Sequence, residues 1–138
     1  MISDIVIINK CATIERCLKR VNEEYRSVND LFGVDYARQD SIILNLQRAC
    51  ESAIDLANYL VKKKKLGVPR DSRAVFDLLA EANIISNEIG GKMKKMVGFR
   101  NLAVHAYQNI EMKIVQKIIE SSQSDFTSFT SQILKTKF

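Results

Sequence analysis

A chain of 138 residues, 46% hydrophobic and 27% charged, has the size and composition of one folded domain, which excludes wholesale disorder. The 21 Lys and Arg against 16 Asp and Glu leave a net charge of +5, which suits phosphate-bearing partners without proving a nucleic-acid role. The apolar runs are too short to span a bilayer and the first residues lack a signal-peptide pattern, so we expect a protein without membrane association.

Cysteine usage indicates the compartment. Cys11, Cys17 and Cys50 are odd in number, and two of them fall at the spacing of a helical core. This pattern predicts three reduced thiols in a cytoplasmic protein, neither a disulfide framework nor a zinc site.

The first predicted helix has one apolar stripe, at steps of three and four residues. From Ile7 the stripe continues through Cys11, Ile14, Leu18, Val21 and Tyr25, with charged residues off it. Asn29, Asp30 and Gly33 then predict a loop.

A second stripe of the same period follows that loop. Its members are Ile43, Leu46, Cys50, Ala53, Ala57 and Leu60. Asp40 or Ser41 is the expected N-cap of this helix. The lysines at 62–65 suit its C-terminal end, and Gly67 and Pro69 should stop it.

Three further helices complete the predicted fold. Asp71 or Ser72 should cap a short third helix, Ser86 should cap a fourth, and a fifth should start near Met112 and continue towards Leu134. Five Gly and one Pro are too few for a β-sandwich, and period-two strand segments are missing from the sequence. We therefore expect an all-α up-and-down bundle, a single domain over 1–138, with four long helices and one short connecting helix.

The candidate catalytic residues lie near the one histidine of the chain, at position 105. Arg100, Asn101, His105 and Tyr107 lie within eight residues of sequence. A lone histidine is more often structural than catalytic, Tyr107 could simply pack its ring, and Arg100 could pair with a surface carboxylate. Together, however, the residues supply what RNA cleavage needs. An imidazole can move the protons of the 2′-hydroxyl and the leaving oxygen, and a guanidinium can hold the phosphate.

The helical phase of these residues constrains the site. If one ideal helix carries them all, Arg100 and His105 lie about 140° apart around its axis. Arg100 and Tyr107 then differ by only about 20° and lie about 10 Å apart along it. Unless the helix is distorted near Ala103, one chain would hold half of a site. A symmetric dimer in which His105 of one chain meets Arg100 of the other would resolve the mismatch.

At these residues the sequence resembles the HEPN domains, and among them the HepT toxins. Their Arg-x4-His-x-Tyr motif is filled by Arg100, His105 and Tyr107, with the polar Asn101 directly after the arginine. The resemblance extends over nearly the whole chain, and includes the segments 8–10, 14–17, 40–51, 66–69 and 96–98.

This resemblance implies an HEPN-like fold and the toxin of a type VII-like toxin–antitoxin system. Such toxins are homodimeric, metal-independent endoribonucleases without a cofactor. The implied roles are general acid or base for His105, phosphate anchor for Arg100 and site orientation for Asn101. The implied partner is an MntA-like minimal nucleotidyltransferase, which would silence the toxin by transferring AMP to Tyr107.

A competing hypothesis is a non-catalytic helical module that recruits a nucleotidyltransferase or binds a nucleotide. Growth arrest on expression of the chain alone would favour the toxin. Lys92, Lys94 and Lys95, just before the motif, favour RNA binding weakly, because such a run is more often a solvated helix face.

Overall fold

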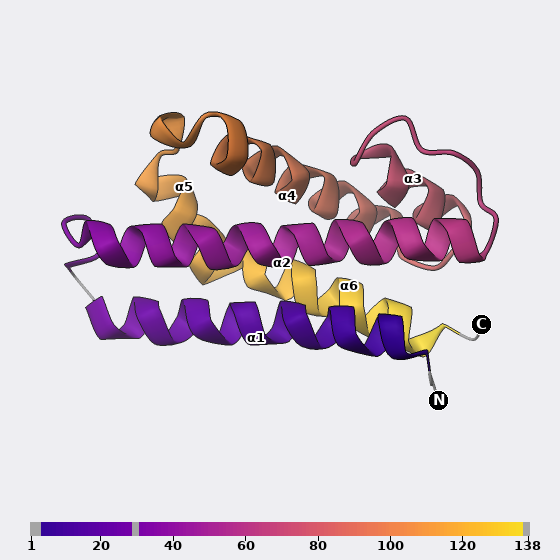
Figure 1. The fold of residues 1–138 in the computed structure, drawn as a ribbon, viewed down its shortest axis with the longest axis horizontal. Helices are drawn as coiled ribbons and strands as arrows, with labels where there is room; N and C mark the ends of the chain where they lie inside the picture. The colour runs from indigo at the N-terminus through magenta and orange to yellow at the C-terminus, as the bar shows by residue number, and fades with distance from the viewer. Residues whose placement is uncertain (1–3, 29–30, 137–138) are drawn as a thin grey trace.

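The structure is a computed structural model that describes residues 4–28 and 31–136, and these residues fold into helices joined by loops (Figure 1). The α-helices are α1 (Ile5–Val28), α2 (Tyr36–Lys63), α3 (Ala74–Glu81), α4 (Asn87–His105), α5 (Met112–Lys117) and α6 (Gln123–Lys135). A short 3₁₀ helix, η2 (Tyr107–Asn109), follows α4, and a π-helical turn, η3 (Ile118–Ser122), joins α5 to α6 without a break. Since α5, η3 and α6 form one continuous helix, the predicted bundle of four long helices and one short connector is confirmed.

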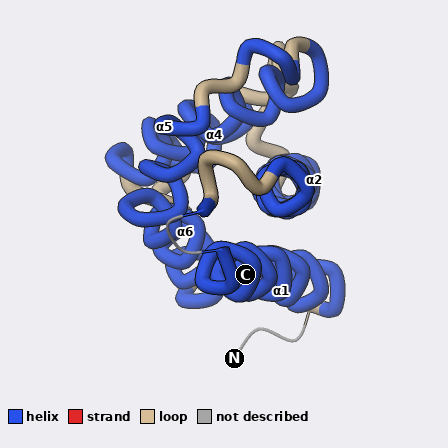
Figure 2. The backbone as a smooth tube through the Cα atoms, turned by 90° about the vertical axis from the view of Figure 1, so that its left-hand side faces the viewer, coloured by secondary structure: helices blue, strands red, loops and turns tan. Residues whose placement is uncertain are grey.

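The helices pack around one apolar core. α1 and α2 lie side by side and antiparallel, and α6 crosses behind them (Figure 1). Figure 2 shows α4, α5 and α6 together on one side of the pair formed by α1 and α2. The first predicted stripe is largely correct, because Ile7, Ile14, Leu18 and Val21 are buried. In the part of the chain that the structure describes, no helix is long and apolar enough to cross a membrane.

The helix ends agree with the sequence in part. Ser86 caps α4 as predicted, because its side chain accepts a hydrogen bond from the N–H of Ile89 at 3.1 Å. Asp71 accepts from the N–H groups of residues 73 and 74 and so satisfies the start of α3. The N-cap predicted for α2 is wrong: the helix begins at Tyr36, and Asp35 caps it by accepting from the N–H of Arg38. Of the loop predicted after α1, residues 29 and 30 lie outside the described residues.

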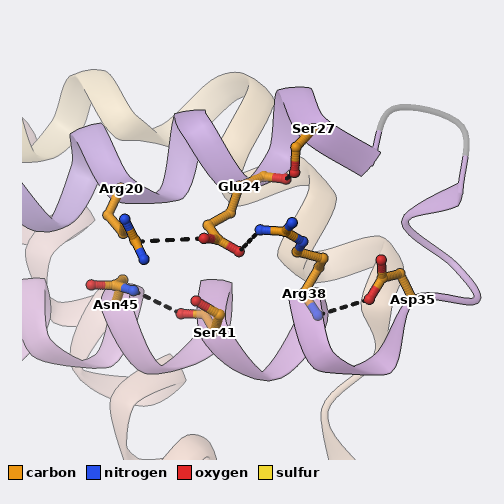
Figure 3. A network of polar contacts seen from close by, with 7 residues as sticks. All are labelled: Arg20, Glu24, Ser27, Asp35, Arg38, Ser41 and Asn45. Atoms are coloured by element: carbon orange, nitrogen blue, oxygen red, sulfur yellow. Dashed lines mark hydrogen bonds and ion pairs between the residues drawn. The ribbon is translucent and has the colours of Figure 1, made fainter.

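A buried carboxylate joins α1 to α2 near this cap (Figure 3). Glu24 of α1 accepts a hydrogen bond from Arg38 of α2 at 2.7 Å and pairs with Arg20 at 3.5 Å. A buried charge requires such partners, because leaving it unpaired is costly. The contact raises the pKa of Arg38 and fixes the start of α2, from which Asp40 reaches the candidate site.

Candidate active site at the end of helix α4

The Arg-x4-His-x-Tyr residues lie where α4 ends. The helix stays α-helical through Gly98 and Ala103 and terminates at His105. Ala106, with φ −147° and ψ 48°, leaves the helical conformation, and the chain then enters η2 with Tyr107. The expected shared helical face of Arg100 and Tyr107 is therefore wrong, because the break at Ala106 places Tyr107 outside α4. The phase difference between Arg100 and His105 stands, because both belong to one continuous α-helix.

Arg100 is half-buried between α4, α2 and the loop before α3. Its Nη2 donates to Ser72 Oγ at 3.3 Å, while its Nε is buried without a hydrogen-bond partner among the described residues. The guanidinium also lies close enough to α2 to affect Cys50: burial raises the pKa of that thiol to about 12, and the charge of Arg100 partly opposes the rise. A buried donor without an acceptor is costly, so such groups are rare in folded proteins. Residues 4–28 and 31–136 thus satisfy the guanidinium only in part.

His105 has a different environment. It is the last residue of α4 and is exposed to solvent, next to the exposed apolar side chains of Leu102 and Val104. Asn101 is half-buried on the same helix. An exposed imidazole is available for proton transfer to an external substrate. Within one chain, however, it does not share a face with the half-buried Arg100.

Tyr107 is held by the first half of α2. Its hydroxyl donates a hydrogen bond to the carboxylate of Asp40, 67 positions away in sequence. Burial, and after it this hydrogen bond to a negative group, raises the pKa of Tyr107 to about 12. Because this pKa lies far above 7, the phenol is protonated at neutral pH. Tyr107 is still 41% exposed, so the phenol is accessible from outside.

Sequence reasoning missed the two partners of the motif. Asp40 and Ser72 were expected to cap helices, whereas in the structure they accept hydrogen bonds from Tyr107 and Arg100. No pattern in the sequence pairs either residue with its partner, since the pairing depends on how α2 and the loop before α3 pack against α4.

The lysines before the motif are mostly engaged within the chain. Lys92 forms ion pairs with Glu88 at 3.3 Å and Asp125 at 3.5 Å, and Lys94 pairs with Asp77 at 2.9 Å. Lys95 is exposed. Their role in RNA binding stays a prediction, with Lys95 the most accessible of the three.

The described residues contain no group of three or more His, Cys, Asp or Glu side chains arranged to hold a metal ion. Cys11, Cys17 and Cys50 are free thiols. The motif side chains at the end of α4 are an imidazole, a guanidinium and a phenol.

Comparison with known proteins gives one consistent result. The family model for ribonuclease HepT-like proteins matches residues 12–133. The mRNA nuclease HepT of Shewanella oneidensis is 45% identical over 128 residues, which cover 93% of this chain and 96% of that protein.

Solved structures agree with this match. A tri-AMPylated Shewanella oneidensis HEPN toxin in complex with an MNT antitoxin is 44% identical, with a TM-score of 0.91, over 96% of this chain and 99% of that one. A toxin–antitoxin structure with AMP-PNP is 43% identical, again with a TM-score of 0.91, over 96% of this chain and all of that one.

Proposed function

Because the chain belongs to the family of ribonuclease HepT-like proteins, we propose that it is the RNA-cleaving toxin of a toxin–antitoxin pair, silenced by AMP transfer. The observation that carries this proposal is the set of Arg100, His105 and Tyr107 at the end of α4, in a chain 45% identical to an mRNA nuclease. Since its substrate would be RNA, the protein acts in the cytoplasm.

His105 moves the protons of the reaction. Its exposed imidazole takes the proton from a ribose 2′-hydroxyl or gives one to the leaving 5′-oxygen. Arg100 binds the phosphate between these oxygens and stabilises the charge that builds up in the transition state. Asn101 orients this arrangement from the next position of α4.

The complete site requires two chains. Arg100 and His105 lie about 140° apart on one regular helix, so the two residues that must meet one phosphate come from different protomers of a homodimer. The exposed Leu102 and Val104 beside His105 provide apolar surface for such an interface. Two histidines in one cleft can also divide the acid and base roles between them.

Control acts through Tyr107. The relative from Shewanella is tri-AMPylated in complex with its MNT antitoxin, and the exposed phenol of Tyr107 is the acceptor that this chain offers at the motif. An MntA-like nucleotidyltransferase would be the antitoxin. The added AMP places a bulky anion at the cleft, where it blocks RNA sterically and electrostatically.

The experiment that tests the proposal is RNA cleavage by the purified chain in buffer containing EDTA. We expect cleavage of single-stranded RNA at an undiminished rate, because imidazole and guanidinium supply the proton transfer and the charge without a metal ion. The rate should follow a bell-shaped pH profile. A chain that leaves RNA intact would be the non-catalytic binding module, and activity that EDTA removes and a divalent ion restores would contradict the metal-free mechanism.

A further inference from the structure

We propose that Asp40 is the base and positioning group through which Tyr107 accepts AMP. This inference rests on the proposed function, because it concerns how the same tyrosine is modified. It assigns to α2 a direct part in silencing the toxin.

The geometry places the carboxylate at the reacting atom. The hydroxyl of Tyr107 donates its proton to Asp40 Oδ1, from η2 across to the second turn of α2. A general base must lie within hydrogen-bonding distance of the proton that it removes, and this bond meets that condition.

Asp40 is available for this role. The cap of α2 is Asp35, so the carboxylate of Asp40 is not used at the helix start. Among the described residues no Lys, Arg or His forms an ion pair with Asp40, and its side-chain hydrogen bond is the one to Tyr107. Among the described residues, no cation therefore competes with the hydroxyl of Tyr107 for this carboxylate.

Tyr107 needs such help. Partial burial and the bond to Asp40 keep the phenol protonated at neutral pH, and a protonated phenol is a poor nucleophile. The same hydrogen bond fixes the direction of the hydroxyl on a side chain that is otherwise 41% exposed. In the resting state the contact positions a protonated phenol, and Asp40 acts as a base only when Oη attacks and the proton moves to Oδ1.

AMP transfer forms one bond to phosphorus and breaks another. Tyr107 Oη attacks the α-phosphorus of an ATP held by the nucleotidyltransferase, and an Oη–P bond forms. The bond from that phosphorus to the oxygen bridging to the β-phosphate breaks, and pyrophosphate leaves with the electron pair. The phenolic proton passes to Asp40, which releases it to water.

After AMP transfer, Tyr107 can no longer form its hydrogen bond to Asp40. The tyrosyl phosphodiester has lost its donor and carries a negative charge next to the carboxylate of Asp40. Like charges at this distance repel, so the modified side chain turns away from α2. Asp40 thus holds the unmodified toxin in the form that is ready for AMP transfer and does not retain the product.

The test compares carboxylate variants of α2 under AMP transfer. Asp40→Asn, Asp40→Glu and the wild-type chain are each incubated with the cognate nucleotidyltransferase and ATP, and the first AMP addition is followed by intact mass. The matched control is Asp55→Asn, an exposed carboxylate of the same helix that pairs with Lys10 at 3.2 Å. Far-UV circular dichroism and thermal unfolding verify that each variant is folded.

We expect Asp40→Asn to lower kcat for the first AMP by about 10²-fold or more, the usual contribution of a general base, with KM for ATP unchanged. Asp40→Glu should recover part of the rate, and Asp55→Asn should match the wild type. Wild-type kcat in folded Asp40→Asn, or a loss confined to KM, would overturn the role of Asp40 and leave the proposed function standing. A wild-type chain that gains no AMP at Tyr107 would overturn both.

Discussion

Replacing His105 with alanine should abolish RNA cleavage. The imidazole is the one side chain of the motif that can both accept and donate a proton near neutral pH, and such catalysis contributes about 10²–10⁴-fold. Because His105 is exposed at the end of α4, its removal should leave the fold and its unfolding temperature nearly unchanged. The measurement is the initial rate of cleavage of a labelled RNA, paired with growth of cells that express the variant.

The matched control is Gln108→Ala, an exposed polar residue in η2 three positions after His105. We expect this variant to cleave RNA and arrest growth like the wild type. A His105→Ala protein that retains wild-type cleavage would assign the chemistry to other residues.

Replacing Tyr107 with phenylalanine should remove control by the antitoxin. The ring is kept, so the fold should be preserved, but the hydroxyl that binds Asp40, which is the proposed acceptor of AMP, is lost. In the presence of the nucleotidyltransferase and ATP, the variant should show no mass increase at this site. It should continue to cleave RNA while the wild-type chain becomes inactive.

Tyr36→Phe is the control for this change, because Tyr36 is an exposed tyrosine at the first residue of α2. It should be modified and silenced like the wild type. If Tyr107→Phe still gains AMP and is still silenced, the control site lies elsewhere in the chain.

The fold was predictable because its signal is repeated along the sequence. Each long helix has an apolar stripe of the same period, and the buried residues of α1 and α2 follow the stripes closely. The start of α2 was missed because its first turn contains Tyr36 and Ala37, both exposed, and the apolar period begins later, at Ile42 and Ile43. A stripe shows which face is buried, but it does not mark a first turn that lies in solvent.

The motif residues could be named from the sequence, and their roles stay a prediction, but their geometry could not be derived from it. A face shared by Arg100 and Tyr107 requires one helix through Tyr107, but the helix ends at His105. The residues around Ala106 contain neither Gly nor Pro to signal this end of α4. The pairing of Asp40 with Tyr107 arises from tertiary packing over 67 positions. Asp and Ser also favour helix caps, so a cap is the role that the sequence suggests for Asp40 and Ser72. In the structure they instead bind Tyr107 and Arg100.

The proposed site of RNA cleavage is built from two chains, with Arg100 from one and His105 from the other. Its most direct test is the heterodimer of Arg100→Ala and His105→Ala chains, co-expressed with different affinity tags and purified through both. Each variant alone should be inactive. The heterodimer rebuilds one of its two composite sites, so it should cleave RNA at about half the wild-type rate. A purified heterodimer as inactive as its parents would contradict the shared site.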